Sequence, residues 1–180
     1  KGNSVSHLHL SDNLSVNSTD ALLLDGLTVD ASVAFSSNQD VDTGILRLLN
    51  GADLSLGSDN MTLTVNDAAT VGEVQTLRSG GGNFRFDGGL TLLSGGELVA
   101  QGGAIAGNLN LSGGRLTIAQ SSVFSGDWTN STSSTITVST NQELNYGGAA
   151  LEIGAGALML TGGGHFLNGN PIRHLIEDRM

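Results

Sequence analysis

The chain has 180 residues, enough for one ordinary domain, and it combines 27 glycines with a single proline. Lys and Arg total 7 against 17 Asp and Glu, a formal net charge of −10. This balance argues against nucleic-acid partners and anionic membrane surfaces, because few cations are available to replace phosphate counterions. Apolar runs are too short to span a bilayer, so no membrane insertion is predicted. The absence of cysteine is compatible with secretion and sets no redox compartment.

Alternating apolar residues predict short β-strands along the whole chain, because a period of two is the signature of a strand with one buried face. Helical periodicity is nearly absent, and Gly, Asn, Asp and Ser fill the intervening turns. Counting these segments predicts roughly 18 to 22 strands. In chain order the clearest pairs are Leu8 and Leu10, Leu14 and Val16, Leu27 and Val29, Leu54 and Leu56, Leu63 and Val65, Phe84 and Phe86, Leu109 and Leu111, Leu116 and Ile118, Ile136 and Val138, and Leu158 and Leu160.

The spacing of the glycines predicts how these strands are arranged. Residues 81–103 read GGNFRFDGGLTLLSGGELVAQGG, with Gly-Gly pairs that begin at 81, 88, 95 and 102. A glycine pair in every heptad would break a coiled-coil helix, whereas five extended residues plus a two-residue corner make one side of a coil. Three sides give a turn of about 21 residues, within the range of solenoid repeats.

The fold class predicted is therefore all-β, a single-stranded parallel β-helix or β-solenoid with about three short strands per turn. Turns stacked about 4.8 Å apart would bury ladders of apolar side chains, and about eight turns would make a rod roughly 40 Å long. The predicted solenoid covers residues 1–170. Residues 171–180 (PIRHLIEDRM) break the alternation at Pro171 and are assigned as a tail or cap.

The chain resembles the β-helical passenger or stalk regions of bacterial autotransporters and filamentous-haemagglutinin-like surface adhesins. The shared features are glycine corners, outward Ser, Thr and Asn, and the lack of Cys. Residues 114–126 (GRLTIAQSSVFSG) are similar to the GxLxLxGxNxYxG unit of many passengers, with Phe124 in the aromatic place, and residues 156–162 (GALMLTG) repeat its first half. The resemblance implies a structural or adhesive segment of a secreted or cell-surface bacterial protein, associated with the outer membrane. Its partners would be a host or bacterial surface, through glycan or protein, and neighbouring domains of a longer chain.

Polysaccharide lyases and phage tailspikes share much of this rhythm, so a carbohydrate-active β-helix that binds or cleaves a polysaccharide is the alternative. Such an enzyme needs carboxylates gathered on one outer face. Most of the carboxylates lie among turn residues, so we interpret them as solvated and predict no catalytic residues. The candidates are Asp25, Asp30, Asp40, Asp42, Asp53, Asp59, Asp67 and Asp87, with Arg47, Arg78 and Arg85 as neutralising cations.

Two other patterns bear on ligands. Asp40 and Asp42, in the segment DVDTG, have the oxygen-ligand spacing of a calcium loop but lack the third acidic ligand and the distal Glu of an EF-hand. No cofactor is predicted, and calcium, with these two residues as ligands, is the one alternative. His7 and His9 form an HxH pair, which we interpret as two exposed imidazoles.

The sequence offers one Trp and one Tyr, residue types that sugar sites use as aromatic platforms. Trp128 and Tyr146 are about one turn apart, so we expect them to be neighbours. Asp127 precedes Trp128 at a glycine corner, next to the most polar stretch of the chain. The candidate ligand-binding residues are Asp127, Trp128 and Tyr146, while packing of Trp128 over the coil as a cover is the favoured interpretation of that residue.

Overall fold

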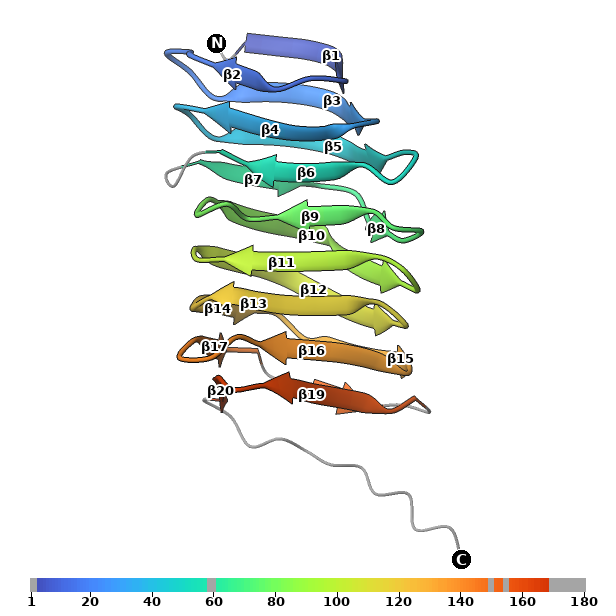
Figure 1. Ribbon diagram of the computed structural model, residues 1–180. Helices are drawn as coiled ribbons and strands as arrows, with labels where there is room; N and C mark the ends of the chain where they lie inside the picture. The colour runs from blue at the N-terminus through green and yellow to red at the C-terminus, as the bar shows by residue number, and fades with distance from the viewer. Residues whose placement is uncertain (1–2, 58–60, 149–150, 154–155, 169–180) are drawn as a thin grey trace, which may run out of the picture.

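The computed structural model describes residues 3–57, 61–148, 151–153 and 156–168, and these form a parallel β-solenoid without helices (Figure 1). The strands belong to two facing sheets. Sheet A has twelve strands: β1 (Asn3–Leu10), β3 (Leu22–Val29), β5 (Val41–Leu48), β7 (Thr62–Val65), β8 (Ala69–Val71), β10 (Asn83–Leu93), β12 (Ala104–Ser112), β14 (Ser122–Ser125), β15 (Trp128–Thr132), β17 (Glu143–Tyr146), β18 (Leu151–Ile153) and β20 (His165–Asn168).

Sheet B takes one strand from each turn. Its eight members are β2 (Leu14–Val16), β4 (Ser32–Ser37), β6 (Asp53–Leu56), β9 (Thr76–Arg78), β11 (Glu97–Gln101), β13 (Arg115–Gln120), β16 (Ser134–Val138) and β19 (Leu158–Gly162). In Figure 1 these strands run from right to left in front, whereas sheet A runs from left to right behind while the chain descends. The coil is therefore right-handed, the hand that parallel crossover connections almost always take.

Strand pairing confirms the predicted turn length of about 21 residues. In the glycine-rich stretch Thr62 lies opposite Asn83, which matches that length. Elsewhere the turns vary around it: the turn that places Glu97 opposite Arg115 is shorter, and the turn that places Ser134 opposite Leu158 is longer. The turn length changes at corners and also at register shifts within strands, such as the one between Ala100 and Gln101 of β11.

The double glycines occupy corners, as the spacing predicts. The pairs that begin at Gly81, Gly95 and Gly102 lie between strands, at the passages between sheets A and B. The pair at Gly88 differs, because it lies inside β10, where the pairing with β12 shifts register between Phe86 and Leu90. Two of the three predicted sides thus belong to one bent sheet, since backbone pairing resumes in sheet A directly after the bend.

The core is a continuous stack of inward apolar side chains. In β10, for example, Phe84, Phe86, Leu90 and Leu92 are buried, while Arg85 between the two phenylalanines is exposed. Each turn lacks enough apolar area to bury these residues alone, so stability comes from stacking on the next turn. The helix-free fold also accounts for a separate finding: among the described residues, no helix has the length and apolarity to cross a membrane.

Side-chain amides join consecutive turns at corners where backbone pairing stops. Asn83 Oδ1 accepts a hydrogen bond from the Ala104 N–H at 2.8 Å, and Asn108 Oδ1 accepts one from the Asp127 N–H at 3.1 Å. Asn13 makes the same kind of bond to the following turn. These bonds satisfy backbone donors that would otherwise lack a partner in the stack. The predicted tail, residues 171–180, lies outside the described residues.

Candidate functional site

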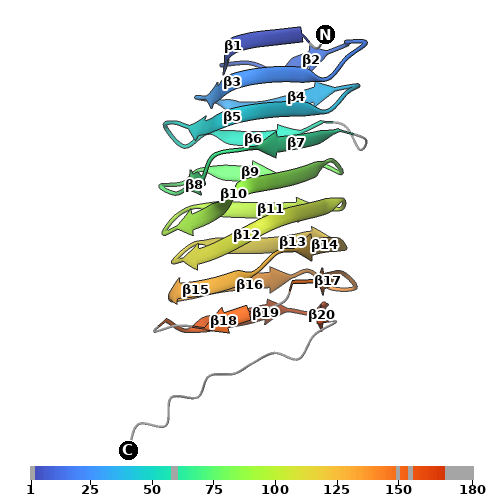
Figure 2. The same cartoon turned by 180° about the vertical axis from the view of Figure 1, so that it is seen from behind.

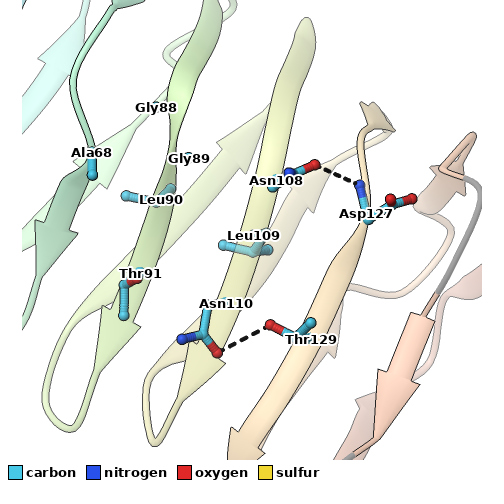
Figure 3. A pocket seen from close by; sticks show the side chains of 10 residues that line it. All are labelled: Ala68, Gly88, Gly89, Leu90, Thr91, Asn108, Leu109, Asn110, Asp127 and Thr129. Atoms are coloured by element: carbon cyan, nitrogen blue, oxygen red, sulfur yellow. Dashed lines mark hydrogen bonds between the residues drawn. The ribbon is translucent and has the colours of Figure 1, made fainter.

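A shallow depression of about 240 Å³ lies on the outer face of sheet A, beside the bend (Figure 3). Gly88 and Gly89 line it, and Gly88 lets the preceding turn approach closely, because a Cβ there would overlap the backbone of Asp67 and Ala68. Polar side chains from β12 and β15 and the loop before β15 form its other wall. The lining residues are Ala68, Gly88, Gly89, Leu90, Thr91, Asn108, Leu109, Asn110, Asp127 and Thr129.

Hydrogen bonds between turns fix the two asparagine side chains of this wall. Because a backbone N–H can only donate, the bond from Asp127 N identifies the Asn108 oxygen and leaves the Asn108 Nδ2 group as a donor for a ligand. Asn110 Oδ1 bonds Thr129 Oγ1 at 3.2 Å and Ser131 Oγ at 3.1 Å. The wall is thus pre-organised, since its amides cannot rotate without losing contacts to the next turn.

An outward polar row runs through the depression along the axis of the solenoid. Thr70, Thr91, Asn110 and Thr129 are successive register partners on β8, β10, β12 and β15. Their hydroxyl and amide groups repeat at the strand spacing of about 4.8 Å. Asp127 is the single ionisable side chain among the lining residues. Such a surface can exchange hydrogen bonds with a hydroxyl-rich ligand.

Trp128 and Tyr146 are neighbours, as expected, with ring centroids 4.7 Å apart. Both rings lie inside the solenoid, with exposed fractions of 0% and 1%, and Phe124 packs edge-on against the Trp128 ring. Burial raises the pKa of Tyr146, and a hydrogen bond with the Trp128 backbone opposes that shift. The pair therefore packs in the core instead of presenting a platform to solvent, while Asp127 remains exposed beside it.

The register of β15 on β12 explains this placement. Trp128 lies opposite buried Leu109, so its side chain points inward, and the outward position passes to Thr129. The sequence interpretation missed Asn108, Asn110 and the two glycines as wall and floor of a site. A detectable signal was present, because Asn108 and Asp127 are about one turn apart in the region of the glycine corners.

The residues proposed for calcium lie near each other on the chain and contact different partners. Asp40 Oδ1 accepts a hydrogen bond from the Thr62 N–H at 2.8 Å, and Asp42 Oδ1 accepts one from the Asn66 side-chain amide. Within the described residues, no group of three or more His, Asp or Glu side chains could hold a metal ion. Calcium binding at Asp40 and Asp42 stays a prediction.

The HxH pair lies on β1, where each imidazole contacts the next turn. His7 Nε2 is 2.9 Å from Thr28 Oγ1, and His9 Nε2 is 2.8 Å from Asp30 Oδ2. Both histidines are exposed, as the sequence predicts. One nitrogen of each ring thus contacts a residue one turn away. His7 connects β1 to Thr28 in β3, and His9 connects β1 to Asp30 just after β3.

The candidate carboxylates are dispersed over both sheets. Asp53 pairs with Arg78 at 2.8 Å on sheet B, and Arg85 pairs with Asp87 at 2.6 Å on sheet A. The hydrogen bond and charge of Asp87 raise the pKa of Arg85. Asp59 lies outside the described residues. The two arginine–carboxylate pairs thus lie on different faces of the solenoid.

No protein-family model matches this sequence, and comparison with curated proteins and with solved structures finds no similar chain. The class of protein is therefore defined by the fold itself, a right-handed parallel β-solenoid. Its surface depression provides the starting point for a functional proposal.

Proposed function

We propose that the chain is a rigid stalk segment of a secreted or cell-surface bacterial protein, and that its outer face makes adhesive contact with a surface glycan or protein. The observation that carries the proposal is the parallel stacking of both sheets, from β1 to β20 in sheet A and from β2 to β19 in sheet B. A rod built this way holds contact groups at fixed spacing along its length.

The adhesive part of the proposal rests on the polar row and the depression in sheet A. Asn108 and Asn110 are held by bonds to the next turn, so a ligand would bind without a large loss of side-chain entropy. Asp127 and the threonines add acceptors and donors on the same wall. Hydroxyl-rich glycans match this mixture of neutral donors and acceptors.

Adhesion can be measured with beads coated with the chain and washed over bacterial or host cells under flow. Beads carrying Thr129→Arg, which places a long charged side chain over the depression, should detach at lower flow than wild-type beads. Ser125→Arg, at an exposed position on the other half of sheet A, is the matched control. Adhesion no better than that of uncoated beads would contradict the proposal.

The stalk itself has a mechanical test. Force spectroscopy of the chain between two handle domains should show unwinding in steps, because turns contact only their neighbours. A turn of about 21 residues adds about 70 Å of extended chain when it is released. Extension at low force with no discrete steps would show that the stack does not bear load.

A second candidate, a carbohydrate-active β-helix, is favoured by the same depression. Glycoside hydrolysis usually employs two carboxyl groups, whereas Asp127 is the one ionisable residue that lines the depression. For this second candidate we therefore propose polysaccharide binding without cleavage. Titration with neutral polysaccharides, followed by calorimetry, should show binding that Asn108→Ala weakens. Release of reducing ends in the same mixtures would instead support cleavage.

A further inference from the structure

Among the described strands, sheet A has one break in its stacking, between β5 and β8. β8 pairs with β10 on one side, and the described ladder has no pairing between β8 and β5 on the other. The Gln75 side chain spans the gap: its Nε2 donates to Leu48 O at 2.7 Å and its Oε1 accepts from Gly72 N at 3.0 Å. A cleft of about 460 Å³ remains between β5 and β8. Figure 2 shows these two strands set apart. We call this space the β5–β8 cleft.

Exposed apolar side chains gather around the β5–β8 cleft. Ile45, Leu49 and Leu93 line it, with exposed fractions of 37%, 42% and 41%. Gly72 also lines it, and a Cβ built there would lie 3.1 Å from Leu93 Cβ, so the Leu93 side chain packs closely over the glycine. Contiguous apolar surface of this kind marks interaction sites on soluble proteins.

A projecting valine stands next to this cleft. Val74 is 76% exposed and has a φ of 64°, a left-handed conformation that β-branched residues rarely adopt. Its Cγ2 lies 3.7 Å from the place a Cβ would occupy on Gly51, and its N–H donates to Gly95 O at 2.9 Å. Both glycines have positive φ values, so Val74 carries a side chain where the two neighbouring turns carry none.

The charges beside the cleft and beside the valine are complementary. Arg47 and Glu73 are both exposed and both line the cleft, and Glu73 directly precedes Val74. Among the described residues, Arg78 and Arg85 have ion-pair partners, whereas no ion pair is found for Arg47. The patch thus carries one cation, one carboxylate and a projecting valine, so two copies related by a two-fold axis can place Arg47 of each opposite Glu73 of the other.

We infer that the β5–β8 cleft receives Val74 of a second copy of this chain, in a side-by-side two-fold dimer. In an isologous contact each copy supplies both the projecting valine and the cleft, so the contact is made twice and closes on itself. Glu73 of the second copy then faces Arg47 beside the cleft it enters. The contact is small, so the dimer is weak and forms at high protein concentration.

Analytical ultracentrifugation of the full chain over a concentration series tests this inference. The wild-type chain should show a monomer–dimer equilibrium, and Val74→Asp should weaken it at least tenfold. Val123→Asp, which changes a valine that is 49% exposed on β14, is the matched control and should dimerise like the wild type. Circular dichroism with thermal unfolding verifies that both variants remain folded.

A charge swap distinguishes this contact from any other association. Arg47→Glu and Glu73→Arg should each weaken the dimer several-fold, and the double variant should restore it, because the pair is reformed with reversed sign across the two-fold axis. A wild-type chain that stays monomeric at the highest concentration would overturn the second-copy assignment in favour of a different occupant. Equal dimerisation of Val74→Asp and Val123→Asp, or a double variant that restores nothing, would also overturn it.

Discussion

Substitution of Gly107 by alanine tests whether the bend in sheet A requires glycine. Gly107 lies in β12 with a φ of 115°, and a Cβ added there would overlap the carbonyl oxygen of Phe86 in the preceding turn. Backbone atoms of a neighbouring strand cannot rotate away as a side chain can. We therefore expect the substitution to separate β12 from β10 locally.

The expected loss can be assembled from its parts. Positive φ costs an alanine about 1–2 kcal/mol, and one or two weakened ladder hydrogen bonds cost about 1 kcal/mol each. The stiffer unfolded chain of alanine returns about 0.5–1 kcal/mol. The free energy of unfolding should fall by about 1–3.5 kcal/mol.

Gly102→Ala is the control that separates the two causes. Gly102 also has a positive φ, of 89°, but the nearest atom to its added Cβ is the flexible Gln120 Oε1, at 3.4 Å. Only the conformational cost remains, so the expected loss is about 1 kcal/mol or less. Urea unfolding followed by the fluorescence of Trp128, the single tryptophan, measures both variants. Equal midpoints for the two alanine variants would refute the steric reasoning.

Three further predictions concern strain, burial and pH. Val74→Gly should stabilise the dilute chain by about 0.5–1 kcal/mol, because relief of left-handed strain exceeds the entropy that glycine adds to the unfolded state; a lower urea midpoint would contradict this. Ser79→Ala should cost about 2 kcal/mol in the same assay, since buried Ser79 Oγ donates to Gly102 O and accepts from the Gln101 N–H; an unchanged midpoint would show that water replaces it. Tyr146, the single tyrosine, has a pKa raised above 10.0 by burial, so its neutral form is favoured in the folded state. Stability should be insensitive to this group below pH 10 and fall as pH rises toward the folded pKa; phenolate absorbance that titrates alike in folded and unfolded chains would disprove the shift.

The strands and the turn length could be predicted from the sequence because both are written in local patterns. Alternation such as Phe84 and Phe86 fixes a buried and an exposed face, and the double glycines mark where a strand must end or bend. The exposed position of Arg85 follows from the same alternation. These features depend on neighbours within a few residues, so no knowledge of the stacked partner is needed.

The candidate site depended on how one turn lies on the next. Pairing with Leu109 sends Trp128 into the core and leaves Thr129 outside, and the step from Asn108 to Asp127 closes the wall of the depression. In β15 (WTNST) no apolar alternation marks the buried face, so the register with the next turn selects it.

The break between β5 and β8 is a tertiary feature for the same reason. The chain after β7 follows β5 as far as the Asp67 N–H, which donates to Gly44 O, and β8 then takes up the register of β10, where Ala69 lies opposite Leu90. Because β8 pairs with β10, its other side, toward β5, is left unpaired, and the Gln75 side chain spans that gap.

The sequence by itself determined the strands, the corners and the turn length of this protein. The stacked turns decided which face of a polar strand such as β15 points inward, where the ladder opens and which surface can receive a partner. The physical reason is that these properties belong to contacts between residues about one turn apart, and no local pattern records which residue of the next turn lies opposite.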